Sequence, residues 1–296
     1  MNLTAEVWVG NATDTIKQLP DNSVQTVVTS PPYWGLRDYG NDDQLGLERN
    51  PDDFIDNLCK VFDEIWRVLK DDGTIWVNLG DTYSAQRWSG AGKGQAMNKM
   101  SDGHRDINPI KESGLPDKNL VGIPWRFAFA MQKRGWYLRQ DIIWAKPNPM
   151  PESVTDRCTK SHEYIFLMSK NAKYKYDHEA IKEDSIWSED RRAGQGRLHY
   201  DGKRQGQEGT VQENFVAITE KRNKRDVWNV AVKSYREAHF ATYPPELITP
   251  CILAGSAEGD IVLDPFSGSG TTGEVALLHN RNYIGLELNP EYAKLS

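Results

Sequence analysis

The stretch from Asp260 to Glu287 constrains the fold of this chain more than any other segment. Its pattern indicates an apolar strand that ends at Asp264, a glycine-rich turn, a helix over Thr271 to His279, and a second strand that ends at Glu287. Glycine permits a tight turn and a close backbone approach, and a helix that begins directly after the turn offers free N–H groups. Glu287 follows Gly270 by 17 residues, near the offset of about 20 at which an acid meets ribose hydroxyls in this architecture. We therefore predict a nucleotide-binding strand–helix–strand unit.

The first residues of the glycine-rich turn bear on the kind of nucleotide cofactor. A dinucleotide dehydrogenase is the competing interpretation, because its fingerprint is also a glycine-rich turn between a strand and a helix. Here the turn opens with Asp264-Pro265-Phe266 in place of a first glycine. An acid and an aromatic ring beside the ligand suit a cofactor with an ammonium or sulfonium group better than one with a pyrophosphate.

The remaining apolar patterns predict further strands and helices that alternate along the chain. Strands are expected over Ala5–Val9, Val24–Thr29, Thr74–Leu79, Tyr137–Trp144, Tyr164–Met168 and Asn282–Glu287, and helices over Asp14–Leu19, Asp52–Leu69, Asn119–Lys133 and Glu246–Leu253. The helix from Asp52 has apolar residues at spacings of three and four, and Asp72-Gly73 is expected to end it. This alternation predicts an α/β fold with a mostly parallel sheet and helices on both faces.

A second prominent segment, Ser30-Pro31-Pro32-Tyr33, follows the predicted strand Val24–Thr29, at a carboxyl end where open α/β sheets place their ligands. Two prolines lack N–H groups and rigidly present the preceding carbonyls and the Ser30 oxygen. Tyr33 offers a face on which a flat ring can stack. An exocyclic amine on such a ring is a poor nucleophile, and acceptors that hold its hydrogens would let its lone pair point at a methyl donor. The segment predicts a site for an amine-bearing ring, with a rigid turn as the alternative.

The cysteines and the hydropathy exclude several classes of protein. Cys59, Cys158 and Cys251 are widely spaced and odd in number, which argues against a disulfide framework or a thiolate metal site, and no metal is expected. Cys251 follows Pro250, a pair that is the nucleophile in enzymes that methylate carbon 5 of cytosine, but its apolar helical surroundings predict a core residue. The chain has no apolar run of about 18 to 20 residues and no charged-then-apolar N-terminal pattern. We therefore expect a soluble, intracellular protein.

Charge is unevenly distributed along the chain. The net charge is −6, yet residues 170–236 hold 15 Lys and Arg against 11 Asp and Glu, interleaved with aromatic residues. This composition suits contacts to a nucleic-acid backbone and to bases, and we expect a smaller lobe here that lies outside the main sheet. A solvated peripheral insertion is the alternative.

The composition of residues 84–118 predicts a long mobile loop. This loop is either functional, with Arg87 near DNA phosphates, or disordered.

The order of these features resembles that of a known family. A catalytic Ser30-Pro31-Pro32-Tyr33 segment, then a recognition region, then the cofactor loop are arranged as in the β class of amino-group DNA methyltransferases, over nearly the whole chain. The resemblance implies a Rossmann-like, seven-stranded sheet with a reversed last hairpin, S-adenosyl-L-methionine as cofactor, and flipping of the target base. It also implies a catalytic half at 1–169, a target-recognition region at 170–236 and a cofactor-binding half at 237–296.

The resemblance assigns roles to individual residues. Ser30 Oγ and the Pro31 carbonyl would accept the amine hydrogens, Asp264 would orient the cofactor amino group, and Glu287 would bind its ribose. The cofactor-binding residues implied are Asp264, Pro265, Phe266, Ser267, Gly268, Ser269, Gly270, Thr271, Thr272 and Glu287, with Thr242, Tyr243 and Pro244 flanking the methionine part. The residues expected to contact DNA are Trp34, Arg37, Arg87, Lys146, Arg191 and Arg192.

The first residue of the catalytic segment bears on the target base. In this family Asp or Asn usually precedes Pro-Pro-Tyr in adenine-N6 enzymes, whereas Ser is commoner in cytosine-N4 enzymes, so the resemblance favours N4 of cytosine. Ser30 could also accept a hydrogen bond from adenine N6. An RNA or protein amino-group methyltransferase, which usually has the reverse motif order, and a non-catalytic DNA-binding protein are less favoured.

The resemblance also implies partners and a location. Double-stranded DNA is the expected substrate, and a restriction endonuclease partner and a homodimer are further expectations. No membrane contact is expected, and the location implied is the cytoplasm of a bacterial, archaeal or phage-infected cell.

Overall fold

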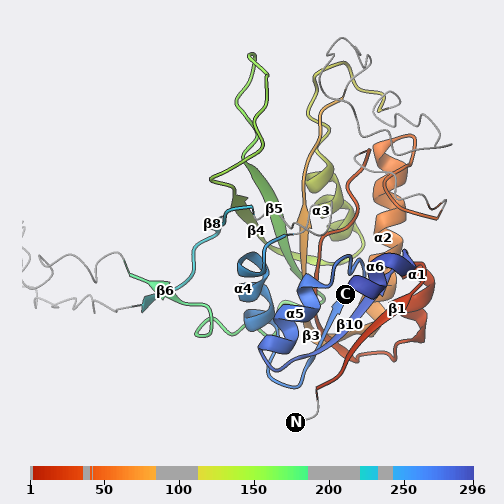
Figure 1. Ribbon diagram of the computed structural model, residues 1–296, viewed down its shortest axis with the longest axis vertical. Coiled ribbons are helices and arrows are strands. Elements are labelled where there is room, and N and C mark those ends of the chain that lie inside the picture. The colour runs from red at the N-terminus through yellow and green to blue at the C-terminus, as the bar shows by residue number, and fades with distance from the viewer. Residues whose placement is uncertain (1–2, 36–40, 42, 85–112, 186–220, 233–242) are drawn as a thin grey trace, which may run out of the picture. The chain divides into compact units, whose positions relative to one another are not determined.

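The computed structural model describes residues 3–35, 41, 43–84, 113–185, 221–232 and 243–296. Two compact units form, one made of Met1–Asp177 with Asp226–Ser296 and the other of His178–Arg225. The first unit contains an eight-stranded sheet (Figure 1). Its strands are, in spatial order, β1 (Ala5–Val9), β10 (Asn282–Glu287), β9 (Ile261–Asp264), β2 (Val24–Thr29), β3 (Leu69–Leu79), β5 (His162–Ser169), β4 (Tyr137–Ala145) and β8 (Val227–Asn229).

The sheet is parallel from β1 to β3, and β5 is antiparallel to both of its neighbours, β3 and β4. These seven strands confirm the predicted Rossmann-like α/β sheet with a reversed hairpin. The eighth, β8, pairs in parallel with β4 through Trp144 and Trp228. Residues 227–229 were expected in the smaller lobe, and that expectation is wrong for them, because Trp228 is buried against the sheet edge.

The helices cover the two faces of this sheet according to the direction in which the chain crosses it. Helix α2 (Pro51–Val68) contacts both α1 (Ala12–Thr15) and α3 (Ile123–Lys133). Helices α4 (Pro245–Gly255) and α5 (Thr271–Leu278) contact each other on the other face (Figure 1). Right-handed crossovers carry the chain one way from β2 to β3 and the opposite way from β9 to β10. The strand order therefore reverses between β2 and β9, and such a switch point is where open α/β sheets bind ligands.

Helix α2 supplies much of the core on its face. Its buried stripe of Phe54, Leu58, Phe62 and Ile65 is fully inaccessible to solvent, and the Asn50 side chain caps its first turn by accepting from the Asp53 N–H at 2.8 Å. At about 1.5–3 kcal/mol for each fully buried apolar side chain, this stripe is a large term in the stability of the sheet.

Two helix boundaries differ from the sequence prediction for local reasons. Helix α2 ends at Val68, one residue before the predicted Leu69, and Asp72-Gly73 lies within β3 rather than ending the helix. Leu69 is already extended and pairs with Val24 as the first residue of β3. Helix α3 begins at Ile123 rather than at Asn119, because Gly122 has a φ of 80°, in the left-handed region.

The remaining helices are short. The first expected helix, Asp14–Leu19, is observed as α1 followed by a 3-10 turn, η1 (Ile16–Gln18). The last helix, α6 (Pro290–Leu295), packs beside β1 and β10.

The smaller unit, His178–Arg225, is described only at its two ends. Strands β6 (Glu183–Asp184) and β7 (Lys221–Arg222) pair in antiparallel fashion, and the Glu183 carboxylate pairs with the guanidinium groups of Arg222 and Arg225. The target-recognition assignment of 170–236 stays a prediction, since 186–220 and 233–236 lie outside the described residues. Residues 85–112 of the expected loop also lie outside them.

Aromatic residues just before the smaller unit, which the sequence analysis grouped with possible base contacts, pack on the main sheet. Tyr176 stacks on Trp76 of β3 with ring centroids 6.3 Å apart, and the Tyr174 hydroxyl accepts from Arg139 Nε at 3.1 Å. None of the described helices is both long enough and apolar enough to cross a membrane.

The three cysteines differ sharply in accessibility, which gives a test of the fold. Cys59 on α2 and Cys251 on α4 are buried, as predicted for Cys251, whereas Cys158 is exposed. Burial raises the pKa of the Cys59 thiol to about 12, so almost none of it is thiolate at pH 8.

We predict that a thiol-reactive chromogenic reagent labels one cysteine per native chain at pH 8 and three in denaturant. A Cys158→Ser variant should lose the native signal, and rapid native labelling of two or three thiols would contradict this packing.

Candidate active site

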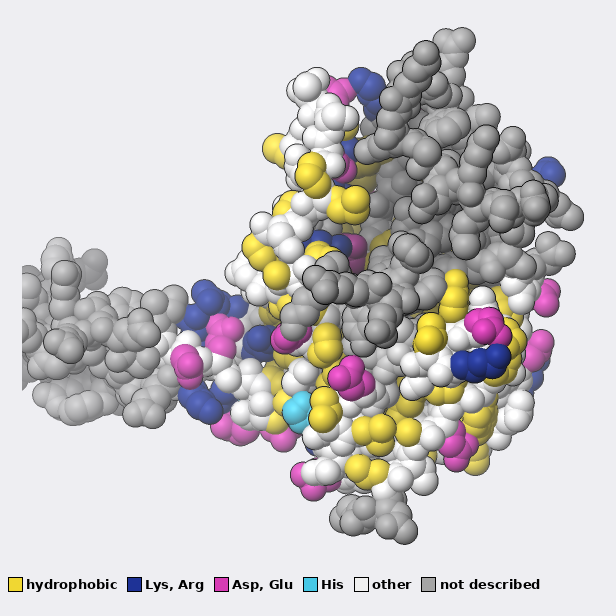
Figure 2. Space-filling view, viewed as in Figure 1, with side chains coloured by type: hydrophobic (Ala, Val, Ile, Leu, Met, Phe, Trp, Pro, Cys, Tyr) yellow, Lys and Arg dark blue, Asp and Glu magenta, His cyan; other side chains and the backbone are white. Residues whose placement is uncertain are grey.

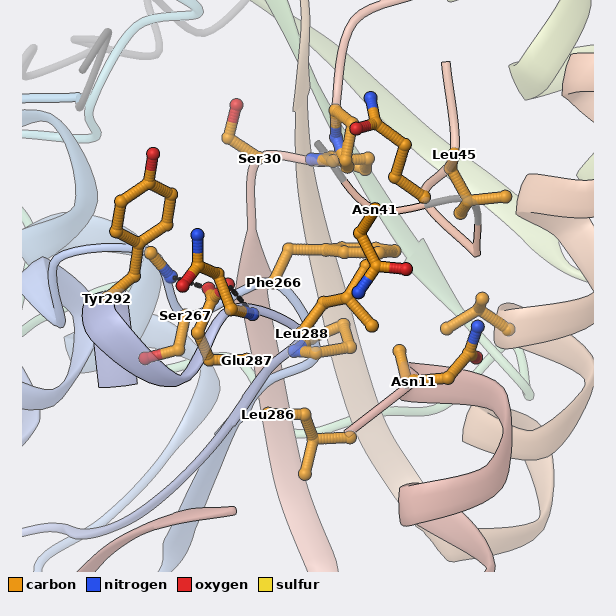
Figure 3. A pocket seen from close by; sticks show the side chains of 18 of the residues that line it. Asn11, Ser30, Asn41, Leu45, Phe266, Ser267, Leu286, Glu287, Leu288 and Tyr292 are labelled. Carbon is orange, nitrogen blue, oxygen red and sulfur yellow. Dashed lines mark hydrogen bonds between the residues drawn. The ribbon is translucent and has the colours of Figure 1, made fainter. Parts of the chain in front are cut away.

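A cavity of about 370 Å³ opens at the carboxyl ends of β2 and β9, where the strand order reverses. Residues from both segments singled out in the sequence line it. They are Ser30, Pro31, Pro32 and Tyr33 after β2; Pro265, Phe266, Ser267, Gly268, Ser269 and Thr271 after β9; Leu286, Glu287, Leu288, Asn289, Pro290 and Tyr292 at the end of β10; and, from elsewhere, Gly10, Asn11, Ala12, Thr13, Asn41, Asp43, Gln44, Leu45, Val61 and Tyr243. In Figure 3, Phe266, Glu287 and Leu288 gather between Ser30 and Leu286.

Glycines hold the backbone of the catalytic segment close to its neighbours. A Cβ at Gly80 would lie 2.6 Å from the Tyr33 ring, and one at Gly46 would lie 3.0 Å from the Tyr33 carbonyl oxygen. Because Gly80 has no side chain, the Tyr33 ring can rest directly on the backbone that follows β3. Trp34 is 2% exposed and donates through Nε1 to the Glu48 carbonyl at 2.9 Å. The expected DNA contact through Trp34 is therefore wrong, because its side chain is a core group.

A polar network lies behind the catalytic segment, at the meeting ends of β3, β4 and β5. Asn78 Oδ1 lies 3.4 Å from Ser30 Oγ and 3.2 Å from the Tyr33 hydroxyl. The Tyr33 hydroxyl donates to Glu163 Oε2 at 2.6 Å, and Lys146 Nζ pairs with Glu163 Oε1. Lys146 was expected to contact DNA, and in this structure its ammonium lies between that carboxylate and the Trp144 ring, 4.1 Å from the ring centroid.

Asp264 lies beneath the cavity and does not line it. Its carboxylate is buried and lies within hydrogen-bond distance of four donor groups, Thr29 Oγ1 at 2.6 Å, Phe266 N at 3.0 Å, Tyr243 OH at 3.1 Å and Thr272 Oγ1 at 2.6 Å. The Tyr243 and Thr272 hydroxyls also contact each other, so one of their two hydrogens is shared between them. Burial raises the pKa of Asp264, against the opposing effect of these donors. The carboxylate is 1% exposed and enclosed by these protein donors, so it is not placed to meet a cofactor amino group in the cavity. The expected direct role of Asp264 is therefore corrected to a structural one.

Glu287 is placed at the cavity wall by backbone hydrogen bonds. Its Oε2 accepts from Gly268 N and its Oε1 from Asn289 N, both at 2.8 Å, as the dashed lines in Figure 3 mark. Burial raises the pKa of Glu287, and the two N–H donors counter that effect. A carboxylate offers about four acceptor positions, so Glu287 can still accept a hydrogen bond from a bound molecule.

The glycines of the loop after β9 have different roles. Gly268 and Gly270 have φ angles of 53° and 82°, which only glycine adopts readily. Gly273 lies in α5, and a Cβ there would collide with the Tyr283 ring at 2.7 Å. The first two glycines therefore shape the turn, while the third lets α5 pack against β10.

The predicted residues divide into three groups by position. Those lining the cavity are the four catalytic-segment residues, Pro265 to Ser269, Thr271, Glu287 and Tyr243. The residues that are described but are not among the lining residues are Gly270, Thr272, Pro244, Asp264, Trp34 and Lys146. Thr242, Arg37, Arg87, Arg191 and Arg192 lie outside the described residues.

The described surface adds little about DNA contacts. On the face of the larger unit in Figure 2, Lys and Arg side chains are interspersed with Asp and Glu. Across the part of the chain that the structure covers, no group of three or more His, Cys, Asp and Glu is arranged to hold a metal ion.

Sequence reasoning missed several residues of the site. Leu286 and Leu288 flank Glu287, so an apolar residue on either side of the predicted ribose-binding acid was an available indication. Asn78 and Glu163 lie at the ends of two strands that were predicted, but only the strand order shows that these ends are neighbours.

The reversed β4–β5 hairpin and the cavity at the switch point define a Rossmann-like methyltransferase fold. A family model described as DNA methylase, covering N6 and N4 methyltransferases, matches residues 24–296. The chain belongs to this DNA methylase family. Among curated relatives it is 47% identical to the Type II methyltransferase M.Cfr9I of Citrobacter freundii over 293 residues, which is 99% of this chain and 86% of the relative. It is 45% identical to M.SmaI of Serratia marcescens over 298 residues, which is 99% of this chain and 89% of the relative.

Solved structures of lower identity share the fold. The PvuII DNA methyltransferase, named as cytosine-N4-specific, superposes with a TM-score of 0.66 at 18% identity, covering 100% of this chain and 86% of that one. A Thermus thermophilus protein solved in complex with S-adenosyl-L-methionine superposes with a TM-score of 0.58 at 23% identity, covering 99% and 92%.

The donors that surround Asp264 predict a large loss of stability when the carboxylate is removed. An Asp264→Ala variant would leave the Thr29 hydroxyl and the Phe266 N–H without their buried acceptor, while the Tyr243 and Thr272 hydroxyls would keep only each other. At about 1–3 kcal/mol for an orphaned buried group, with the hydroxyls partly rearranging, we expect a loss of about 3 kcal/mol in urea unfolding at pH 7. Asp264→Asn is the matched control and should lose less, because its carbonyl still accepts and the hydroxyls can turn to accept from its amide. A loss below about 1 kcal/mol for the alanine variant would show that Asp264 does not hold the two strands.

Proposed function

We propose that this protein transfers a methyl group from S-adenosyl-L-methionine to the exocyclic N4 of a cytosine flipped out of duplex DNA. One observation carries the proposal: the Ser30–Tyr33 segment and the glycine-rich loop, far apart in the sequence, line a single cavity. Membership of the DNA methylase family supports the methyl-transfer chemistry and DNA as the substrate. The Type II names of the relatives support a role in restriction and modification, with a partner endonuclease.

The residues of the cavity suit S-adenosyl-L-methionine. A volume of about 370 Å³ lies within the range of small-molecule sites. Phe266 and Leu288 offer apolar surfaces for an adenine ring, and Glu287 keeps lone pairs for ribose hydroxyls. Ser269 and Thr271 supply polar groups for the amino-acid part, and Tyr243 also lines the cavity. When bound, this cofactor supplies a methyl group activated by a sulfonium.

The catalytic segment prepares the amine. Ser30 Oγ and the Pro31 carbonyl accept its two hydrogens, so that the nitrogen lone pair is free to turn toward the methyl group. The Tyr33 ring, resting on Gly80, gives the flipped base a rigid face to stack on. Acceptors held in position before the substrate binds avoid the cost of reorganising during the reaction.

Cytosine N4 is favoured over adenine N6 by Ser30 and by the family pattern around it. A hydroxyl is shorter than the Asp or Asn side chain usual in adenine enzymes, and it provides one acceptor beside the Pro31 carbonyl. The cytosine-N4 specificity named for the PvuII enzyme is consistent with this choice. The alternative is the same transfer to adenine N6, whose amine has the same two hydrogens to be held.

The target base is the first prediction to test. Methyl-labelled S-adenosyl-L-methionine is incubated with mixed-sequence duplex DNA, and the digested nucleosides are resolved by mass spectrometry. We expect N4-methylcytosine. Label in N6-methyladenine would retain the enzyme and overturn the inference from Ser30. Label in neither, with the cofactor still bound, would overturn DNA methyl transfer, and the same assay on RNA would then test the RNA alternative.

Substitutions in the catalytic segment test the roles of its side chains. Tyr33→Ala removes the stacking face, which is worth about 1–3 kcal/mol per base, and together with loss of alignment should lower kcat about a hundredfold. Tyr33→Phe keeps the ring and should lose less than about tenfold. Ser30→Ala removes one acceptor and should lower kcat by about a hundredfold or more. Cofactor affinity, measured by calorimetry, should stay within about threefold in all three. Full activity of Tyr33→Ala would disprove base stacking.

A further inference from the structure

We propose that Asn78 sets the hydrogen-bond direction of the Ser30 hydroxyl, so that Ser30 meets the target amine as an acceptor. This inference rests on the proposed function, in which Ser30 accepts a hydrogen bond from that amine. A serine hydroxyl can donate or accept, and a hydroxyl that pointed its hydrogen at the amine would oppose the reaction. A partner that only accepts, placed behind Ser30, removes that ambiguity.

The orientation of the Asn78 amide follows from its other neighbours. Asn78 Nδ2 lies 3.1 Å from the Tyr164 carbonyl oxygen and 3.2 Å from Glu163 Oε2. Both of these atoms can only accept, so the amide nitrogen must face them and the amide oxygen must face away. That oxygen lies 3.4 Å from Ser30 Oγ. Because an amide oxygen cannot donate, the Ser30 hydroxyl gives its hydrogen to Asn78 and turns a lone pair toward the cavity.

Every group that contacts the two carboxylate oxygens of Glu163 in this network is a donor. Lys146 Nζ pairs with Oε1, while Tyr33 and Asn78 both donate to Oε2, at 2.6 Å and 3.2 Å. The Tyr33 hydroxyl has a single hydrogen, and its shorter contact is to Glu163 rather than to Asn78. The Asn78 oxygen is thereby left to take the hydrogen of Ser30.

Strand register brings these groups together. Asn78 is paired with Ile165 across β3 and β5, and Trp144 is paired with Glu163 across β4 and β5. Asn78 is 4% exposed, and an amide is buried at this depth at a cost unless both of its ends are hydrogen-bonded. Here each end has partners, and the donors run in one direction from Ser30 through Asn78 to Glu163. Asn78 is thus a positioning residue that acts through Ser30.

A double-mutant cycle tests this action. All variants carry Tyr33→Phe, which keeps the ring and removes the phenol that also contacts Asn78. Within that background Asn78→Leu, which preserves side-chain volume, is combined with Ser30 or with Ser30→Ala. The single-turnover rate of methyl transfer is measured with saturating cofactor and DNA. We expect Asn78→Leu to slow transfer by about tenfold or more when Ser30 is present and by less than about threefold beside Ser30→Ala.

An acceptor of the same shape gives the rescue arm. A protonated Asn78→Asp side chain has the layout of the amide, because its carbonyl oxygen accepts from Ser30 and its hydroxyl donates to Glu163 Oε2 or to the Tyr164 carbonyl. When ionised, it would instead set an oxygen against these two acceptors. The transfer rate of this variant, relative to its Tyr33→Phe parent, should therefore rise as the pH is lowered. Melting curves and cofactor affinity check that each variant is folded, and Asn78→Ala replaces Asn78→Leu if the latter does not fold.

The outcomes separate this inference from the proposed function. Equal slowing by Asn78→Leu with Ser30 and with Ser30→Ala would overturn it, since Asn78 would then support the strands and not Ser30. A relative rate of Asn78→Asp that does not rise as the pH is lowered would overturn it as well. Failure of the proposed function would instead appear as no methyl transfer to DNA by the unmodified protein, whatever residue 78 is.

Discussion

The hydrogen bond from Thr29 to Asp264 is the interaction on which the rest of the site depends. It joins the last residue of β2 to the last residue of β9 at 2.6 Å, across 235 positions of sequence. Ser30 and Pro265 are the next residues along each strand, so this bond sets how far the catalytic segment stands from the cofactor loop. Burial makes the bond stiff, because no water can replace a lost partner.

The reversal of strand order explains why one buried carboxylate can hold both halves. The helices that follow β2 and β9 lie on opposite faces of the sheet. No backbone therefore crosses above the carboxyl ends of these two strands, and a gap remains there. Side chains from both loops must then satisfy each other or a ligand. Asp264 satisfies Thr29, Thr272 and Tyr243 beneath the gap, while Phe266 and Glu287 remain above it as the cavity wall.

Sequence patterns were enough for the elements and not for the contacts between them. The strands Ala5–Val9, Val24–Thr29 and Asn282–Glu287 were predicted to the residue because each is a short apolar run closed by turn residues. The end of α2 was missed because Leu69 continues the helical period while its backbone is already a strand. The role of Asp264 was misjudged because its position in the motif says nothing of the donors around it. Asn78 and Glu163 escaped because their proximity comes from the antiparallel β5, which no local pattern reveals.

The polar groups of the site are of two kinds: those whose oxygens are hydrogen-bonded only within the protein, and those that can also accept a hydrogen bond from the cavity. This difference bears on catalysis. Asp264 and Glu163 direct their oxygens at protein donors and hold the framework. Ser30 and Glu287 are held by protein groups on one side and keep acceptor capacity on the side of the cavity. Methyl transfer to a poor nucleophile gains from acceptors that are already aligned, since their alignment is then part of folding and not of the reaction barrier. A network whose donors run one way, from Ser30 through Asn78 to Glu163, gives that alignment in the folded protein before the substrate binds.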